Sequence, residues 1–187
     1  MRETRSAHDE FSYPSHTNLH PPHLSHRTAS QVLSAVQDVI NKSGTSSVTT
    51  VGHSLGAALS LLDSVYLRLQ LPADIIVKAI LYGLPRVGNR AWANLVDAQL
   101  PGNVAHVNNK RDPVPILPGR FLGYHHPSGE IHIDTTSGEW DACPGQDNPS
   151  TMCSVGAVPS LLFGKPGDHD GPFDGISMPC NPKSGSE

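Results

Sequence analysis

A serine with a glycine two residues away on either side is the feature of this sequence best suited to nucleophilic chemistry: Gly52-His53-Ser54-Leu55-Gly56. The β-branched run at 47–51 predicts a strand before it, and apolar spacing over 57–69 predicts a buried helix after it. A serine on so sharp a turn presents its hydroxyl beside the positive end of the helix. The pattern predicts Ser54 as the nucleophile of an acyl transfer, with the Leu55 N–H stabilising the oxyanion. A side chain at either glycine is expected to collide where strand and helix meet. The alternative is an ordinary glycine-flanked turn.

Such a serine needs a histidine to take its proton and a carboxylate to orient that histidine. In a strand–serine–helix fold, the acid follows the serine in the chain and leaves the carboxyl end of a later strand. Asp112 fits this position, since it follows an expected strand over 104–107 and precedes the stiffening Pro113 and Pro115. On spacing alone, a surface aspartate without a catalytic role is the competing interpretation.

Four histidines follow Asp112, namely His125, His126, His132 and His169. The first three fall in an expected β-hairpin whose strands are 121–126 and 130–133. His169 lies in a polar loop, 167–172, from which a general base could reach Ser54, and it is favoured over His126. His53 adjoins Ser54, but neighbouring side chains on such a turn diverge, which makes it a poor base.

The elements around these residues predict an α/β fold, with a mostly parallel sheet and flanking helices. A helix is expected from Thr28, ending at a Gly44 cap, and the apolar run 75–82 predicts a strand covered on both faces. Asn89 is expected to cap a further helix that carries Trp92. Strands that alternate with helices in this way are typical of a parallel sheet wrapped by helices.

Composition excludes several function classes. The 187 residues suit one domain, and 13 basic against 17 acidic residues give a net charge of −4, which argues against nucleic-acid binding. The longest apolar runs fall short of the roughly 18 residues that cross a bilayer, and the N-terminus lacks the apolar stretch of a signal peptide. Residues 1–27 predict an irregular His/Pro-rich arm, with metal binding as the less favoured alternative. Cys143 and Cys153 are close enough to pair, which leaves Cys180 over.

Several motifs together resemble the class 3 lipases, the fungal triacylglycerol lipase family. They are Thr50–Ala58, Tyr82–Asn89, Asn109–Pro115, Gly123–Ile133, Cys143–Asn148 and Asp168–Gly175, and the resemblance spans residues 26–180. It implies an α/β-hydrolase domain over 28–187, Ser54 as nucleophile, Asp112 as acid and His169 as base, with no metal or organic cofactor. The expected substrate is an acylglycerol ester. The residues expected to contact it are His53, Leu84, Val87, Ile116 and Leu117.

The sequence departs from the family at its front, where the family has further strands, a lid, a secretion signal and a second oxyanion donor. An N-terminally truncated fold is therefore expected. Two other functions stay open: a feruloyl-type esterase of the same family, and an impaired lipase-like protein that only binds lipid. The family implies an extracellular protein that acts on lipid esters, including at a lipid–water interface. Because the sequence shows no signal peptide, retention in the cytoplasm stays open as the alternative.

Overall fold

The computed structural model describes residues 22–135 and 137–178, with side chains from Thr28 onward. Its helices are α1 (Pro22–Ser43), α2 (Leu55–Gln70), α3 (Arg90–Gln99) and the short α4 (Ser154–Ala157). Its strands are β1 (Ser47–His53), β2 (Ile76–Tyr82), β3 (Gly88–Asn89), β4 (Val104–Asn109), β5 (Tyr124–His125), β6 (Glu130–Ile133) and β7 (Trp140–Cys143). Four 3-10 turns follow in the second half: η1 (Val114–Ile116), η2 (Arg120–Leu122), η3 (Leu161–Phe163) and η4 (Pro166–Asp170).

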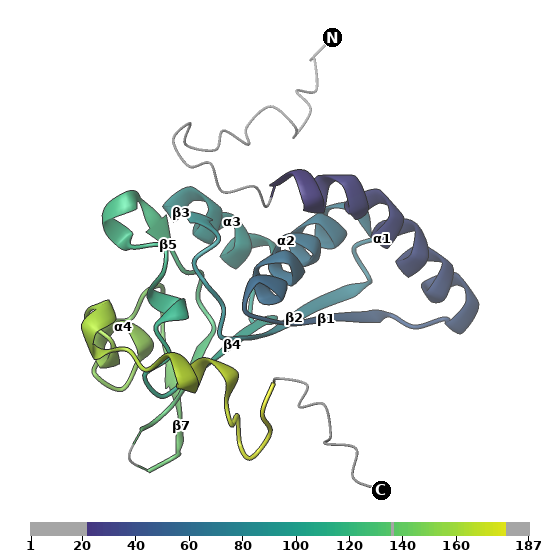
Figure 1. Ribbon diagram of the computed structural model, residues 1–187. Helices are drawn as coiled ribbons and strands as arrows, with labels where there is room; N and C mark the ends of the chain where they lie inside the picture. The colour runs from purple at the N-terminus through teal and green to yellow at the C-terminus, as the bar shows by residue number, and fades with distance from the viewer. Residues whose placement is uncertain (1–21, 136, 179–187) are drawn as a thin grey trace, which may run out of the picture.

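The five-stranded main sheet has the order β1-β2-β4-β6-β7. The first four strands run parallel, and β7 pairs antiparallel with β6. With three long helices packed beside it, this sheet confirms the predicted α/β architecture (Figure 1). The carboxyl ends of β1, β2 and β4 meet at one rim because parallel neighbours end at the same edge.

The helix ends follow the capping chemistry of the sequence. Gly44, with φ 68°, donates its N–H to the Ile40 carbonyl at 2.9 Å and ends α1 as predicted. The Asn89 side chain accepts the Trp92 N–H at 3.0 Å and starts α3. Helix α1, however, begins at Pro22, so the backbone of residues 22–27 is helical where an irregular arm was expected. A proline is well tolerated at a first helical position, because its missing N–H would have no partner there. The remainder of that arm and its metal-binding alternative lie outside the described residues, as does Cys180.

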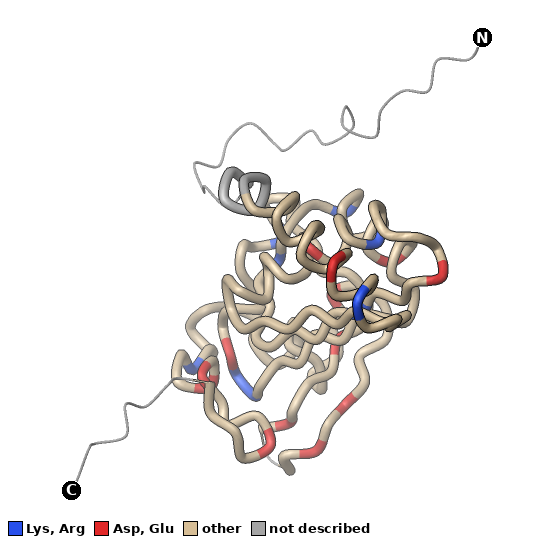
Figure 2. Tube along the Cα trace, turned by 90° about the vertical axis from the view of Figure 1, so that its right-hand side faces the viewer, with Lys and Arg blue, Asp and Glu red and all other residues tan. Residues whose placement is uncertain are grey.

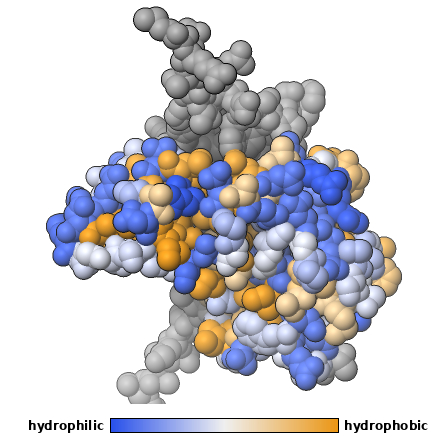
Figure 3. Space-filling view, turned by 180° about the vertical axis from the view of Figure 1, so that it is seen from behind, coloured by the Kyte–Doolittle hydropathy of each residue, from blue (hydrophilic) through white to orange (hydrophobic). Residues whose placement is uncertain are grey.

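Helices α1, α2 and α3 lie on the same side of the sheet (Figure 1), where the main core forms. Its fully buried side chains include Leu61, Leu81, Leu84 and Val96. On the opposite side, Phe173 of the C-terminal segment packs on Val107 and Ile133. That segment reaches only the carboxyl ends of β1 and β2, where Phe173 packs edge-on against His53 and Tyr82, so Val51 is 61% exposed and Ile76 48% exposed. The prediction that the second strand would be covered on both faces was therefore wrong for the described residues. Seen from behind, hydrophobic side chains form a band in this region (Figure 3).

The expected hairpin of 121–126 and 130–133 does not form. Strand β5 pairs with β3 in a separate two-stranded sheet, whereas β6 inserts into the main sheet beside β4. The turn between them docks instead on α3, where Ser128 donates its N–H and hydroxyl to the Asp97 carboxylate at 2.8 and 2.9 Å. Gly129 lies so close to β4 that a Cβ would fall 2.2 Å from the Val104 carbonyl oxygen. These long-range contacts divide the segment between two sheets.

Strand β7 completes the sheet, and a disulfide joins its last residue, Cys143, to Cys153 at a sequence separation of 10. The expected pairing of these two cysteines is therefore confirmed. Lys and Arg positions are interspersed with Asp and Glu along the trace (Figure 2). Within the described part of the chain, no helix combines the length and the apolar character needed to cross a membrane.

Candidate active site

Ser54 is the single residue between β1 and α2, and its backbone has φ 56° and ψ −127°. A positive φ is uncommon for a residue with a side chain and stores strain that the surroundings must hold. The Ser54 N–H donates to the Tyr82 carbonyl at 2.9 Å, which ties the turn to the end of β2. The predicted strand–serine–helix turn is present, and it projects the hydroxyl from the rim of the sheet.

The two glycines around Ser54 differ in their steric roles. A Cβ at Gly52 would lie 2.4 Å from the Gly56 carbonyl oxygen and 2.6 Å from Ser60 Oγ. A Cβ at Gly56 would meet nothing within 4 Å. The expectation that both positions exclude a side chain was therefore wrong for Gly56. The close approach is between the Cα of residue 52 and the helix backbone at residue 56, so only the strand glycine is required.

Ser54, His169 and Asp112 form a continuous chain of hydrogen bonds. His169 Nδ1 lies 2.8 Å from Asp112 Oδ2, and His169 Nε2 lies 2.7 Å from Ser54 Oγ. A carboxylate can only accept, so Nδ1 carries the ring proton and Nε2 accepts the hydroxyl proton of Ser54. The geometry thus selects the tautomer in which histidine can act as a base toward the serine.

Asp112 is held in an almost closed environment, with 1% of its surface exposed. Its Oδ1 accepts the Val114 N–H at 2.8 Å, while Oδ2 faces His169. Burial raises the pKa of this carboxyl, and the hydrogen bonds from His169 and Val114 act in the opposite direction. The buried carboxyl is oriented by its neighbours rather than by solvent.

His169 lies on η4, and three contacts place its backbone. The fully buried Asn109 donates its side-chain N–H to the Asp168 carbonyl at 2.9 Å. The Arg111 N–H donates to the Asp168 carboxylate at 3.0 Å. His53 Nε2 lies 2.8 Å from the His169 carbonyl oxygen, and their rings are 4.5 Å apart. Because a carbonyl only accepts, His53 donates this hydrogen bond and thereby holds the backbone of His169 in place.

Gly83 has a steric role at the site that the sequence did not reveal. It follows β2 with φ 55°, and a Cβ there would lie 2.8 Å from His169 Cε1 and 3.0 Å from Asp112 Oδ2. Its N–H donates to the Val107 carbonyl at 2.9 Å, which fixes it between the two neighbouring strands. A glycine directly after a buried strand was the available signal, since such glycines often mark a close approach.

The Leu55 N–H is in the first turn of α2, where N–H groups have no acceptor within the helix. Leu55 is 59% exposed, so a ligand can approach this end of the helix. The N–H and the partial positive charge of the helix end lie beside Ser54, as an oxyanion requires.

The other candidate bases lie elsewhere. The His126 ring is buried with Nε2 2.7 Å from the Pro115 carbonyl oxygen, and it stacks on His106 at 5.0 Å. Burial lowers the pKa of His126 well below its usual range, and the nearby His106 and Arg86 lower it further. His125 pairs with Asp147, its Nδ1 3.1 Å from Oδ2. His132 bonds two backbone carbonyls. His169 alone of the four contacts Ser54.

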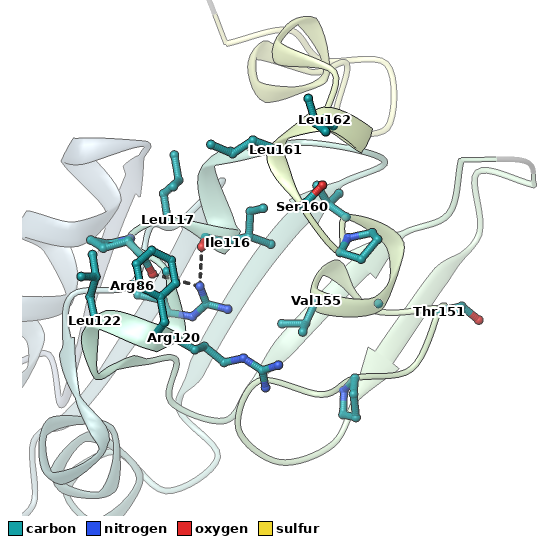
Figure 4. Close-up of a pocket in the computed structure, with 17 residues that line it drawn as sticks. Arg86, Ile116, Leu117, Arg120, Leu122, Thr151, Val155, Ser160, Leu161 and Leu162 are labelled. Atoms are coloured by element: carbon teal, nitrogen blue, oxygen red, sulfur yellow. Dashed lines mark hydrogen bonds between the residues drawn. The ribbon is translucent and has the colours of Figure 1, made fainter.

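A cavity of about 1140 Å³ opens beside the segment that follows Asp112. Its walls are mostly apolar and come largely from η1, η2, α4 and η3, including Ile116, Leu117, Leu122, Val155, Leu161 and Leu162 (Figure 4). Of the expected substrate contacts, Ile116 and Leu117 line it. Leu84 is fully buried in the core, Val87 packs against that core, and His53 contacts His169.

A buried ion pair shapes this cavity and was not singled out from the sequence. Arg86 Nη2 and Nε lie 2.7 and 2.8 Å from Asp147 Oδ1. The same guanidinium donates to the Ile116 and Pro118 carbonyls, as the view of the cavity shows (Figure 4). A charged side chain that is only 4% exposed is expected to be fully paired, and here it holds the wall segment 116–118.

The sheet, the serine turn and the Ser–His–Asp array together define an α/β-hydrolase. Solved structures agree: lipase II from Rhizopus niveus superposes with a TM-score of 0.72 at 28% identity, over 83% of this chain and 57% of that chain. The triacylglyceride lipase of Rhizomucor miehei gives a TM-score of 0.67 at 29% identity, over 82% of this chain and 57% of that one.

The family follows from the sequence match. A family model described as lipase (class 3) matches residues 7–122, and the chain belongs to this family. A secreted mono- and diacylglycerol lipase of Malassezia globosa is 47% identical over 111 residues, which are 59% of this chain and 36% of that protein. A secreted mono- and diacylglycerol lipase of Malassezia restricta is 45% identical over 102 residues, 54% of this chain and 34% of that protein. The chain thus spans about a third of the length of the curated relatives it matches.

Proposed function

We propose that this chain is a serine ester hydrolase that cleaves acylglycerol esters through an acyl-enzyme. The observation that carries the proposal is the continuous hydrogen-bond chain from Ser54 through His169 to Asp112. Membership of the class 3 lipases and the names of the Malassezia relatives support acylglycerols over phenolic esters as the substrate class.

In the proposed reaction, Ser54 Oγ attacks the ester carbonyl carbon while His169 Nε2 takes the hydroxyl proton. Asp112 stabilises the imidazolium through Nδ1–H, and the Leu55 N–H donates to the oxyanion. The tetrahedral intermediate collapses, the C–O bond to the alcohol breaks, and His169 protonates the leaving oxygen. A water molecule then attacks the acyl-enzyme with the same proton transfers, which releases the fatty acid and restores the Ser54 hydroxyl.

Exposed side chains around the cavity support a lipid surface as the partner. Phe121 is 90% exposed and Leu122 52% on η2, and Leu161 and Leu162 on η3 are 56% and 93% exposed. All four line the cavity, so its opening has apolar projections on two sides. Contiguous apolar surface of this kind marks an interaction site, and we assign it to contact with aggregated lipid esters.

An extracellular site of action is part of the same proposal. The Malassezia relatives are named as secreted, and this chain contains a disulfide, which persists in oxidising compartments.

The test is hydrolysis of p-nitrophenyl esters with short and long acyl chains by the wild-type chain and by Ser54→Ala. The substitution should lower kcat by about 10⁴-fold or more, because no other group supplies the nucleophile. Matching unfolding curves would show that both proteins are folded. A folded wild-type chain without turnover would contradict the enzymatic proposal and leave lipid binding. Faster cleavage of feruloyl esters than of diacylglycerol would contradict the substrate class.

A further inference from the structure

The His132 imidazole bridges two segments that are far apart in sequence. It lies on β6 and is 1% exposed. Its Nε2 is 2.7 Å from the Lys110 carbonyl oxygen, and its Nδ1 is 2.8 Å from the Met152 carbonyl oxygen. A buried ring with both nitrogens on backbone carbonyls joins the backbones of two loops through a single side chain.

The first of these loops carries Asp112. Lys110 is the first residue after β4 and has φ 48°. Its N–H donates to the Ile133 carbonyl at 2.9 Å, so β6 holds both polar groups of the Lys110 backbone. Asp112 follows two residues later, and its N–H donates to the Asn109 carbonyl at 2.9 Å. The direction in which the chain leaves β4 toward Asp112 is therefore set by contacts with β6.

The second loop is the one closed by the disulfide. Met152 precedes Cys153, whose sulfur is bonded to Cys143 at the end of β7. This covalent closure keeps the Met152 carbonyl over β6. The His132 ring thus lies between a cross-linked loop and the loop that carries Asp112.

Carbonyl oxygens accept hydrogen bonds and cannot donate, whereas a neutral imidazole has a single N–H. Both contacts of His132 can be hydrogen bonds at once only when both ring nitrogens carry protons. The groups in register beside it suit that form: Asp141 on β7 is directly opposite, and Asn108 is its neighbour on β4. One oxygen of Asp141, Oδ2, is buried without a hydrogen bond within the described residues.

Two further charged groups belong to the same surroundings. Glu130, two residues earlier on β6, accepts the Ser154 N–H at 2.7 Å, and Lys110 belongs to the loop itself. Two acidic residues, Asp141 and Glu130, and one basic residue, Lys110, thus lie near His132 along the strands and the loop.

We propose that His132 is a positioning residue of this site, a doubly protonated ring that fixes the Asp112 loop against the disulfide loop. Only the kinetic consequence of this proposal rests on the proposed ester hydrolysis. The link that His132 makes between the two loops does not depend on it. A misplacement of Asp112 by about 1 Å would lower turnover by up to about 100-fold. Substrate binding would change little, since the two hydrogen-bond partners of His132, Lys110 and Met152, do not line the cavity.

The experiment compares wild type with three variants. His132→Phe keeps a flat ring without donors, and His132→Gln restores one side-chain N–H donor. His106→Gln is the matched control, because His106 is an equally buried histidine whose Nε2 contacts the Pro127 carbonyl at 3.2 Å and forms no hydrogen bond with residues 110–112. We expect His132→Phe to lower kcat by about 10- to 100-fold with KM within about twofold, His132→Gln to recover part of the loss, and His106→Gln to keep the wild-type kcat.

Nuclear magnetic resonance supplies a readout that does not need turnover. The wild-type spectrum should show two N–H protons on the His132 ring and a low-field proton from the His169–Asp112 hydrogen bond. That low-field signal should shift or vanish in His132→Phe and persist in His106→Gln. An unchanged signal in a folded His132→Phe protein would overturn the proposal, as would equal losses of kcat in His132→Phe and His106→Gln. If the wild type has no esterase activity, the proposed function fails, but these spectra still test whether His132 positions the Asp112 loop.

Discussion

At the scale of single residues, the site depends as much on a missing side chain as on those that are present. Gly83 leaves the space that His169 and Asp112 occupy, and its N–H is engaged by β4. Its positive φ is tolerated at little cost because glycine has no Cβ. A substitution here tests steric access separately from chemistry, since no reacting group is changed.

Gly83→Ala should reduce kcat/KM by about 100-fold or more, because the added methyl group displaces the imidazole from Asp112 and Ser54. Gly102→Ala is the matched control: Gly102 also has a positive φ, 68°, but a Cβ there meets nothing within 4 Å. Both substitutions introduce a similar backbone strain, and the resulting loss of unfolding free energy can be measured in urea. The rate of ester hydrolysis should then differ between the two variants. Wild-type turnover in a folded Gly83→Ala protein would show that the His169 ring can keep its position beside an added methyl group, which would contradict this prediction.

At the scale of elements, buried charge holds the wall of the cavity in place. Arg86 reaches Asp147 and the carbonyls of Ile116 and Pro118, and Asp147 Oδ2 also accepts the His126 N–H at 3.2 Å. One ion pair thus joins the segment between β2 and β3, the wall segment 116–118 and the residue after β5. Breaking such a pair leaves an uncompensated charge in the interior.

Asp147→Asn is expected to lower the free energy of unfolding by about 3–5 kcal/mol, because the Arg86 guanidinium stays buried without its counter-charge. It should also raise KM for long-chain esters, since the wall at 116–118 loses its support. Asp74→Asn at an exposed position is the control and should stay within about 0.5 kcal/mol. Equal unfolding free energies for the two variants would mean that the ion pair contributes nothing net.

At the scale of the whole molecule, two stacked and fully buried histidines couple folding to pH. Burial lowers the pKa of His106, and burial together with His106 and Arg86 lowers that of His126 strongly. The unfolded chain takes up both protons near about pH 6.5, whereas the folded chain takes them up only at lower pH. The contribution of these two histidines to stability is therefore fully present above about pH 6.5 and is lost as the pH falls below it. The raised pKa of Asp112 acts in the opposite sense, with its contribution lost as pH rises through that pKa.

The free energy of unfolding, measured in urea from about pH 8 to about pH 5, should fall by up to about 2.7 kcal/mol per pH unit below about 6.5. His126→Phe should remove roughly half of that slope. A wild-type profile that is flat across this range would show that neither ring stays neutral in the folded protein.

A feature could be predicted from the sequence when the residues that determine it are close together in the chain. The Ser54 turn depends on adjacent residues, 47–69, whose strand and helix patterns are local, and Asp112 follows from the loop after a strand. The local pattern could only favour His169 through its polar loop, because its partners Ser54 and Asp112 lie 115 and 57 residues away, and the family motif strengthened that choice. The hairpin prediction was wrong because the docking of Ser128 on Asp97 outweighed local hairpin signals. The roles of Gly83 and His132 depend on tertiary contacts, and the position of Gly83 directly after a strand was the one local signal.

The span between the partners of the site has a consequence for the order of events as the chain folds. Ser54 and His169 are 115 residues apart, and His53 reaches the His169 carbonyl across 116. Closing so long a loop costs entropy before any contact repays it, whereas β1, α2 and β2 form from neighbouring segments. We therefore expect the scaffold to form before the reactive centre, so that in a refolding experiment ester hydrolysis should recover later than secondary structure.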